Sequence, residues 1–245
     1  MGKVSLITGG TAGIGRAIVR KIIDESEKDD LVFAVYGHNE DVAYAMKNEL
    51  PKKHRDKVIL VKADLSEYEG IDVVKKAVLE KTDHIDWLIL NTGIGTYLKF
   101  DEYTPDVWEN VMRTNVNVPA FMVKAFKPYF ASGGAILFMG SHAGQATYSS
   151  SLVYSVSKAA VMFMARSLVK QFDSQNVRVN AIAPGFIETR WQENRSKESY
   201  DIINRKIAAH RFGTAEEVAK LCFEVLTNDY LNGGVYDIHG GYDYF

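Results

Sequence analysis

The chain has 245 residues, of which 47% are hydrophobic and 24% charged, the balance of a folded domain rather than a disordered chain. Its 29 Lys and Arg residues against 31 Asp and Glu residues give a net charge of −2, which argues against a strongly basic nucleic-acid surface. The one cysteine, Cys222, excludes an internal disulfide, and no signal peptide or membrane-length apolar run is visible, so we expect a cytoplasmic protein without nucleic-acid or membrane partners.

Short apolar runs alternate with longer amphipathic stretches along the chain. The runs typical of strands are 3–8, 31–36, 58–62, 87–90, 135–139, 177–182 and 235–238. Helical spacing occurs in 13–25, 41–50, 68–81, 105–130, 152–172 and 215–226. Within 105–130, Pro119 and Pro128 predict a kink or an early end.

Strands that are apolar on both faces and alternate with helices indicate a parallel sheet covered on both sides. No Pro-, Gly- or Ser-rich linker divides the chain. We therefore predict a single α/β domain over 1–245, a doubly wound parallel sheet of about seven strands with helices on both faces. The polar segment 187–211 is the one plausible mobile insertion.

A glycine-rich turn lies between the first predicted strand and the first predicted helix. Glycines allow a tight turn and a close approach to a pyrophosphate, and free N–H groups at a helix start suit an anion. The spacing is G-x-x-x-G-x-G rather than the commoner G-x-G-x-x-G, and an ordinary strand-to-helix turn can look similar. The strand–turn–helix context nevertheless favours a dinucleotide site. Its predicted cofactor-binding residues are Thr8, Gly9, Thr11, Gly13, Ile14 and Gly15.

The end of the second predicted strand bears on the choice between NAD(H) and NADP(H). An acidic residue about 20 residues beyond the glycine turn usually binds the ribose 2′-hydroxyl group. Here the strand ends in Tyr36, Gly37, His38 and Asn39, with neither Asp nor Glu. The missing carboxylate removes the hydrogen bonds that select NAD(H) and the repulsion of a 2′-phosphate. We therefore favour NADP(H), leave NAD(H) open, and assign Tyr36, His38 and Asn39 to the cofactor site.

Tyr154 and Lys158 are four residues apart in an apolar helical segment, so their side chains share one helix face. A free tyrosine has a pKa of about 10, and a nearby ammonium group lowers it toward the range of an acid–base catalyst. Ser141 ends the fifth predicted strand, at the edge where open α/β sheets bind ligands. Its hydroxyl group can orient a substrate carbonyl toward Tyr154. Each feature alone is common, as a surface pair or a turn serine.

Together these residues resemble the short-chain dehydrogenase/reductase family, whose members are Rossmann-fold NAD(P)-dependent oxidoreductases. The resemblance covers essentially the whole chain. Its order and spacing match at the glycine turn, Ala63-Asp64-Leu65, Asn91-Thr92-Gly93, Asn115, Ser141, Tyr154, Lys158, Asn180 to Thr189, and Gly233 to Gly241.

The resemblance implies a role for each matching residue. Tyr154 would donate a proton to the carbonyl oxygen during reduction, and Lys158 would lower the pKa of Tyr154 and hold the nicotinamide ribose. Ser141 would position the carbonyl group. Asn115 would hold a water that links Lys158 to solvent. The other implied cofactor contacts are Asp64, Leu65, Asn91, Gly93, Pro184, Gly185, Ile187 and Thr189, although Asp64 also suits a helix N-cap.

Three positions depart from the family pattern. Leu90-Asn91-Thr92-Gly93 replaces the usual Asn-Asn-Ala-Gly, the cofactor-selecting strand end is indeterminate, and His239 stands where the family often has Asp. The segment 187–211 resembles the family's substrate lid. We assign Thr96, His142, Tyr148 and Trp191 to the substrate pocket, where His142 also suits a wall residue and Trp191 a lid anchor. We find no His, Asp and Glu grouping that suggests a metal and expect none.

The expected activity is hydride transfer between a nicotinamide and a carbonyl or secondary alcohol, with a 3-oxoacyl thioester, sugar or polyol, steroid or small ketone as the substrate. The alternative is a non-catalytic NAD(P)-binding regulator on the same fold, but such proteins usually lose a catalytic side chain and this chain keeps them all. A purely structural scaffold would require a glycine turn without a ligand. The resemblance also implies a homotetramer or homodimer that uses the helices around 105–130 and 152–172.

Overall fold

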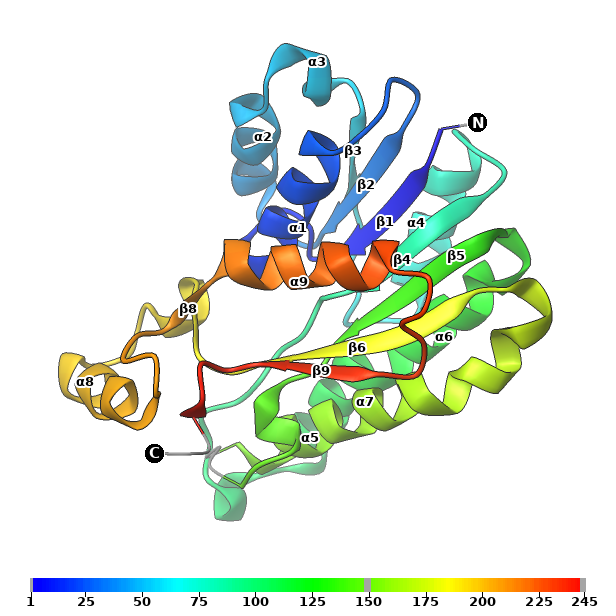
Figure 1. Ribbon diagram of the computed structural model, residues 1–245. Helices are drawn as coiled ribbons and strands as arrows, with labels where there is room; N and C mark the ends of the chain where they lie inside the picture. Colours follow the sequence, from blue (N-terminus) through cyan, green and yellow to red (C-terminus); the bar gives the residue numbers. More distant parts are fainter. Residues whose placement is uncertain (1, 148–150, 243–245) are drawn as a thin grey trace.

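The computed structural model describes residues 2–147 and 151–242, and its centre is a sheet of seven parallel strands (Figure 1). The strand order is β3-β2-β1-β4-β5-β6-β9. The order reverses between β1 and β4, and ligands of such sheets bind at the carboxyl ends beside this reversal. The predicted doubly wound sheet is confirmed. The strands are β1 (Val4–Thr8), β2 (Leu31–Tyr36), β3 (Val58–Lys62), β4 (Ile85–Leu90), β5 (Phe130–Met139), β6 (Arg178–Pro184) and β9 (Val235–Ile238).

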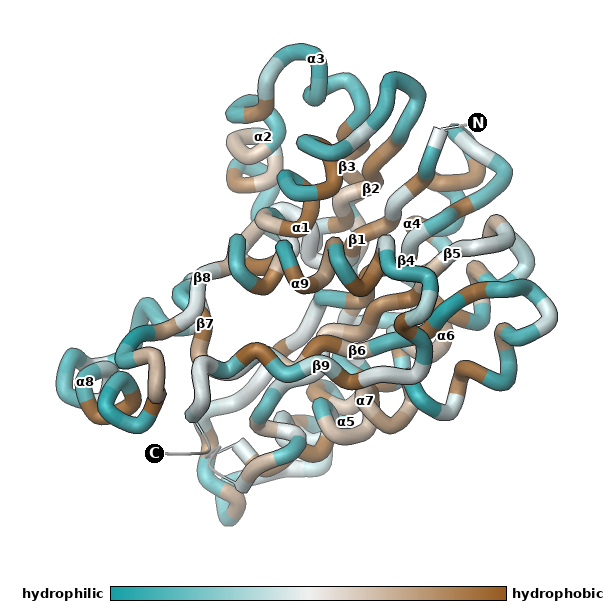
Figure 2. The backbone as a smooth tube through the Cα atoms, viewed as in Figure 1, coloured by the Kyte–Doolittle hydropathy of each residue, from teal (hydrophilic) through white to brown (hydrophobic). Residues whose placement is uncertain are grey.

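Helices cover both faces of the sheet because neighbouring residues of a strand point to opposite sides. In β1, Leu6 belongs to the core under α4 (Glu69–Leu79), α6 (Val118–Phe126) and α7 (Leu152–Phe172). The next residue, Ile7, belongs to the core under α1 (Gly13–Asp24), α2 (Glu40–Glu49) and α9 (Ala215–Thr227). Figure 2 shows the result as apolar strands within a more polar outer layer.

The predicted helical region over 105–130 is confirmed, with a change of helix type inside it and an end just before Phe130. Helix α5 (Pro105–Met112) passes through a π-helical turn, Arg113–Asn117, into α6, and a 3-10 turn, Lys127–Tyr129, follows. Pro119 lies directly after the π-helical turn, where the hydrogen-bonding pattern of the helix changes, and the helix continues through it. The strand β5 then starts at Phe130, earlier than predicted.

Two small elements were not predicted from the sequence. The short helix α3 (Lys52–Arg55) lies between α2 and β3. The strands β7 (Ile187–Glu188) and β8 (Gly213–Thr214) form a separate two-stranded parallel sheet. This small sheet joins the two ends of the 187–211 segment, which also holds a 3-10 turn, Arg190–Gln192, and α8 (Lys197–Lys206).

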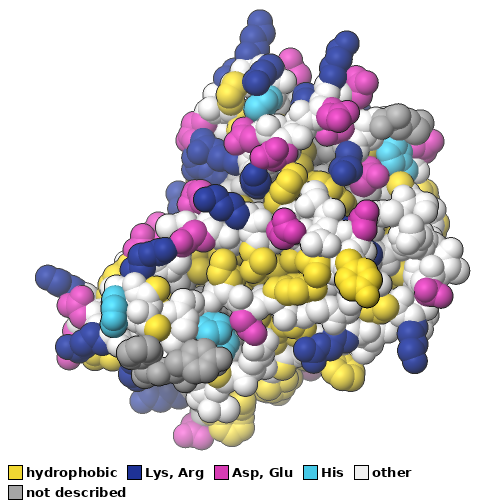
Figure 3. Space-filling view, viewed as in Figure 1, with side chains coloured by type: hydrophobic (Ala, Val, Ile, Leu, Met, Phe, Trp, Pro, Cys, Tyr) yellow, Lys and Arg dark blue, Asp and Glu magenta, His cyan; other side chains and the backbone are white. Residues whose placement is uncertain are grey.

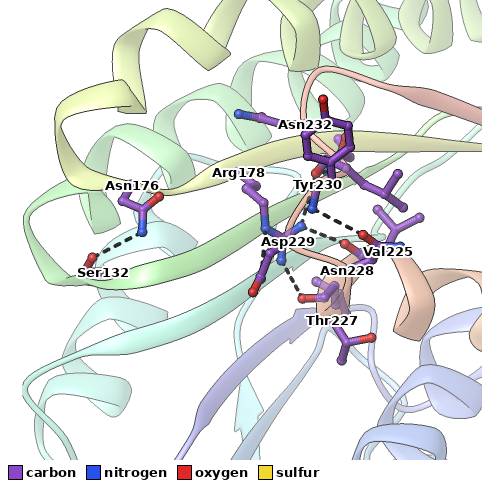
Figure 4. Close-up of polar contacts among 12 residues, drawn as sticks. Ser132, Asn176, Arg178, Val225, Thr227, Asn228, Asp229, Tyr230 and Asn232 are labelled. Carbon is purple, nitrogen blue, oxygen red and sulfur yellow. Dashed lines mark hydrogen bonds and ion pairs between the residues drawn. The ribbon is translucent and has the colours of Figure 1, made fainter.

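Arg178 ties the C-terminal end of α9 to the start of β6 (Figure 4). Its buried guanidinium group donates to the carbonyl oxygens of Val225 at 2.8 Å and Leu226 at 2.7 Å. A third bond, of 3.2 Å, reaches the carbonyl oxygen of Leu231. The last carbonyl groups of a helix lack intrahelical donors, so a cation there supplies both hydrogen bonds and a favourable interaction with the helix dipole.

Helix α7 with the turn after it, Leu152–Gln175, is long and apolar enough to cross a membrane by length and composition, with a mean hydropathy of 1.4. Core helices pass the same test, and α7 buries Val161, Met162 and Ala165 against the sheet core. On the face drawn in Figure 3, charged side chains gather over α2, α3 and α8, while hydrophobic side chains form a band over α9 and β9.

Candidate active site

Tyr154 and Lys158 lie one turn apart on α7, and Ser141 follows the end of β5. Lys158 is buried, and its Nζ donates a hydrogen bond of 2.8 Å to the carbonyl oxygen of Met139. Burial disfavours the ammonium form and lowers the pKa of Lys158 to about 8. The same Nζ atom lies 5.7 Å from the centre of the Tyr154 ring. The structure therefore brings three of the four predicted catalytic side chains, Ser141, Tyr154 and Lys158, to one edge of the sheet.

Two effects act on the Tyr154 hydroxyl group. Burial raises its pKa above the ordinary value, and a hydrogen bond with the Ser141 side chain partly opposes this. Burial is the larger effect, so the pKa of Tyr154 is raised overall. In this arrangement the lowering comes from Ser141, because the Lys158 amine is directed at Met139. A tyrosine with a raised pKa stays protonated at neutral pH.

Asn115 lies in the π-helical turn between α5 and α6 and is buried. Its Oδ1 accepts from the backbone N–H of Ile94 at 2.8 Å, and its Nδ2 donates to the Ile94 carbonyl oxygen at 2.8 Å. Nδ2 also donates to Ser157 Oγ at 2.9 Å. The side chain thus fixes the loop after β4 against α7. The predicted water held by Asn115 stays a prediction.

The glycine turn is shaped by close backbone approaches. Gly9 has a φ of +62°, and a Cβ atom at Gly15 would lie 2.0 Å from the Gly9 carbonyl oxygen, so a side chain at Gly15 is excluded. Thr8 Oγ1 accepts from the backbone N–H groups of Asn91 and Thr92 at 2.9 and 3.0 Å. These bonds join the ends of β1 and β4, beside the reversal of strand order.

Residues from the far end of the fold approach the same turn. A Cβ atom at Gly13 would lie 3.4 Å from Thr189 Cγ2, so the start of the 187–211 segment lies over the glycine turn. Thr11 is buried and Ile14 is half-buried beside it. A Cβ at Gly93 would lie 3.1 Å from Lys158 Nζ, so this glycine makes room for the lysine. Predicted cofactor residues from distant parts of the sequence therefore lie close together in the fold.

The ends of β2 and β3 carry the predicted residues of the cofactor's adenosine side. His38 is exposed, and its Nε2 lies 3.9 Å from Asp64 Oδ2. Asp64 Oδ1 accepts from the side chain and the backbone N–H of Ser66, and these bonds lower the pKa of Asp64. Asp64 therefore fixes the turn at Ser66 and does not cap α4, which begins at Glu69. Asn39 caps α2 by accepting from the N–H of Val42.

Other predicted cofactor residues fall into the same framework. Tyr36 is buried at the end of β2, and Leu65 is buried after β3. Pro184 ends β6, and the N–H of Gly185 donates to the Ile238 carbonyl oxygen at 2.9 Å. Ile187 is buried in β7. These contacts place the residues after β6 at the carboxyl edge of the sheet, on the same side as Tyr154.

On the substrate side, the Trp191 ring lies against Tyr154, with 5.6 Å between the ring centres. A Cβ atom at Gly95 would lie 3.1 Å from Trp191 Cζ2, so the glycine lets the indole approach. Thr96 Oγ1 accepts from the N–H of Leu98 at 3.2 Å and shapes the loop after β4. His142 is buried beside Ser141. The predicted pocket residue Tyr148 lies outside the described residues.

Comparison with known proteins assigns this architecture to a family. A family model described as short chain dehydrogenase matches residues 3–199. The chain belongs to the short-chain dehydrogenase/reductase family. It is therefore an oxidoreductase of the class that acts on alcohol and carbonyl groups.

Two kinds of relatives illustrate the match. The 3-oxoacyl-acyl-carrier-protein reductase FabG of Aquifex aeolicus is 33% identical over 247 residues, covering 98% of this chain and 97% of that protein. A blue fluorescent protein from a metagenomic library, solved in complex with NADPH, is 25% identical with a TM-score of 0.90, covering 98% of each chain. A short-chain dehydrogenase from Burkholderia cenocepacia J2315, solved with NADP, shares the fold at 24% identity and a TM-score of 0.90, covering 99% of this chain and 98% of that one.

In this short-chain dehydrogenase, sequence reasoning missed partners that act through the backbone or across distant strands. Met139 contacts Lys158 through its carbonyl oxygen, so its side chain carries no signal. Asp237 and His239 lie close to His142, although the sequence suggested no such group. The departure of His239 from the family pattern was the one sequence signal for this second site.

Proposed function

We propose that this short-chain dehydrogenase reduces a carbonyl group to a secondary alcohol with NADPH, using Tyr154 as the acid. The observation that carries the proposal is the position of Tyr154 one helical turn from the buried Lys158, whose Nζ lies 5.7 Å from the centre of the tyrosine ring, with Ser141 near enough to lower the pKa of the Tyr154 hydroxyl group. The proposal assigns a proton donor, an orienting hydroxyl group and a cationic side chain to the edge of the sheet where ligands of such folds bind.

The residues of the chain would divide the work as follows. Ser141 donates a hydrogen bond that orients the substrate carbonyl, and Tyr154 gives its proton to the carbonyl oxygen. The bound nicotinamide supplies the hydride. Tyr154 is protonated at neutral pH, as reduction requires, but its raised pKa makes it a weaker acid than free tyrosine, so the nearby Lys158 ammonium group is needed to stabilise the anion that forms. The Lys158 ammonium group, 5.7 Å from the centre of the Tyr154 ring, stabilises the tyrosinate anion, and the Trp191 ring covers the tyrosine ring.

The choice of NADPH rests on the end of β2. His38 and Asn39 occupy the position next to the ribose 2′ group in dinucleotide folds, and His38 is exposed enough to meet a phosphate. The first acidic residue beyond them, Glu40, is neutralised by Lys62, whose Nζ lies 2.7 Å from Glu40 Oε2. The NADP and NADPH complexes of the similar structures support the same choice.

The substrate class we favour is a 3-oxoacyl thioester. The similarity to the Aquifex aeolicus reductase supports it, and so do the exposed apolar side chains of Leu98, Phe100 and Trp191, which can contact an acyl chain. Sugars, polyols, steroids and small ketones are the competing classes.

The same proposal includes a substrate lid at 187–211, a cytoplasmic location and a homotetramer or homodimer through α6 and α7. Phe121 and Phe163 are exposed apolar side chains of these two helices.

The proposal is tested by titrating the protein with NADPH and NADH, read by nicotinamide fluorescence, and then by a panel of carbonyl substrates. We expect tighter binding of NADPH and the highest kcat/KM with 3-oxoacyl thioesters. Tight cofactor binding without turnover of any carbonyl or alcohol would favour the non-catalytic regulator instead. Binding of neither cofactor would contradict the assignment of the glycine turn. Sedimentation at 27 kDa alone would reject the oligomer.

A further inference from the structure

Three side chains from distant parts of the chain meet at the carboxyl end of the sheet, near β9. His142 follows Ser141 after β5, Asp237 belongs to β9, and His239 follows β9 directly. One nitrogen or carboxylate oxygen atom of each lies within 4.8 Å of the other two. Within 2–147 and 151–242 this is the one group of three or more His, Cys, Asp or Glu side chains with such spacing. On the face drawn in Figure 3, histidine and acidic side chains adjoin at this end of β9.

The topology explains why the three side chains meet. Asp237 and His239 are two residues apart, so they point to the same side of the strand. Strand β6 lies between β5 and β9, and Gly185 follows its end. A Cβ atom at Gly185 would lie 2.6 Å from His239 Cβ. Because glycine has no side chain, His239 can lie against the end of β6. The His142 and His239 rings then lie with their centres 4.3 Å apart.

We propose that His142, Asp237 and His239 bind a divalent transition-metal ion such as Zn²⁺. Two imidazoles and one carboxylate are ligands that suit zinc and its neighbours, whereas Mg²⁺ and Ca²⁺ prefer oxygen ligands. Zinc ligands lie about 2.0–2.2 Å from the metal, so ligand atoms of a tetrahedral site are about 3.4 Å apart. The three ligand atoms lie within 4.8 Å of one another, so metal binding requires the exposed Asp237 and the half-buried His239 to move closer to the buried His142.

Metal binding is linked to the C-terminal turn through His239. The backbone N–H of Tyr242 donates to His239 Nδ1 at 3.1 Å. A metal on Nδ1 takes the lone pair that this N–H uses, and a metal on Nε2 moves the ring proton to Nδ1. In both cases the Tyr242 N–H loses this bond and keeps its longer one, of 3.3 Å, to the carbonyl oxygen of His239. The Tyr242 ring packs on Phe186, with 5.2 Å between ring centres, so the metal is coupled to the base of the 187–211 segment.

The test is a titration of chelator-treated full-length protein with Zn²⁺ by calorimetry and with Co²⁺ by visible absorption. We expect one Zn²⁺ per chain and a Co²⁺ spectrum of low coordination number. Asp237→Asn and His239→Asn are expected to weaken Zn²⁺ binding at least tenfold. The matched control is His84→Asn, which removes an imidazole near Asp83 and Asp86 at the opposite edge of the sheet and is expected to keep wild-type binding.

A second readout separates this site from adventitious binding. Zn²⁺ is expected to speed hydrogen exchange at the Tyr242 amide in the wild type and not in Asp237→Asn. Asp237 is exposed, so this variant is expected to fold and remains decisive even if His239→Asn does not. The proposal is overturned if the wild type binds no Zn²⁺ at micromolar concentrations, or if Asp237→Asn binds it as tightly as the wild type does. It makes no use of the proposed reductase activity.

Discussion

Lys158 Nζ donates its 2.8 Å hydrogen bond to the carbonyl oxygen of Met139, the last residue of β5. The bond fixes the amine at the carboxyl edge of the sheet, one helical turn from Tyr154. The same burial lowers the pKa of Lys158 to about 8. Burying the Lys158 ammonium group therefore lowers the free energy of unfolding. Buried ionisable groups with shifted pKa values are typical of catalytic sites, which explains why the protein keeps this lysine.

The first prediction is that Lys158→Met makes the protein without cofactor more stable at pH 7. A shift from 10.5 to about 8 corresponds to about 3 kcal/mol, and loss of the bond to Met139 offsets about 1 kcal/mol. We therefore expect a gain of about 2 kcal/mol in the free energy of unfolding. Urea unfolding at pH 7 measures it. Lys62→Met, at an exposed lysine, is the matched control and is expected to gain nothing.

The pH dependence of this gain has a definite sign. Because the pKa of Lys158 is lower in the folded state, the folded protein binds fewer protons than the unfolded chain between about pH 8 and 10.5. Wild-type stability from this group therefore rises with pH across that window. The advantage of Lys158→Met should be constant below pH 8 and shrink above it. If the difference in the free energy of unfolding between Lys158→Met and the wild type grew with pH, the lowered pKa of Lys158 would be contradicted.

The second prediction concerns Arg178. Arg178→Met leaves the buried carbonyl oxygens of Val225 and Leu226 without their side-chain donor, while Leu231 keeps its bond from Asn180, so we expect a loss of about 3 kcal/mol in the free energy of unfolding. Arg20→Met is the control, because Arg20 makes an exposed ion pair with Glu49 and is expected to cost less than about 1 kcal/mol. Equal losses in the two variants would show that the bonds in Figure 4 contribute little.

The third prediction is that His38→Asp reverses the choice of cofactor. The new carboxylate would repel a 2′-phosphate and accept a hydrogen bond from a 2′-hydroxyl group. We expect the ratio of kcat/KM for NADPH to that for NADH to fall at least about tenfold, since like charges placed together cost several kcal/mol. His38→Gln, without the charge, should change the ratio less. An unchanged ratio in His38→Asp would place the 2′ group elsewhere.

The fourth prediction concerns the contact between Gly95 and Trp191. A methyl group in Gly95→Ala would lie 3.1 Å from the Trp191 ring and move it off Tyr154. We expect KM for the carbonyl substrate to change several-fold while the Kd for NADPH stays constant. Trp191→Phe keeps an aromatic ring and should partly preserve KM. If Gly95→Ala changes only the NADPH affinity, the indole is not part of the substrate pocket.

The fold was largely predictable because its signals are local. Apolar strands alternating with helices predict the parallel sheet, and the observed order agrees. The π-helical turn at Arg113–Asn117 was not predictable, because its residues have ordinary helical spacing and the irregularity is accompanied by the contact of Asn115 with Ile94 and Ser157.

The candidate site was predictable only for residues whose type and spacing in the sequence indicate their role. Tyr154 and Lys158 share a helix face by spacing alone, and Ser141 joins them through the topology. The balance of burial and hydrogen bonding at Tyr154 depends on packing that no spacing reveals. His142 and His239 are nearly a hundred residues apart and follow two strands that are not neighbours in the sheet, so only the three-dimensional fold brings them together.

The measurement that tests the central claim most directly is single-turnover hydride transfer from NADPH to a 3-oxoacyl thioester, in the wild type and in Tyr154→Phe. Loss of the transferable proton should slow the step about a thousandfold, while the Kd for NADPH changes less than about threefold. Ser141→Ala should slow it less, because the tyrosine proton remains. Hydride transfer at the wild-type rate in Tyr154→Phe would contradict the assignment of Tyr154 as the acid.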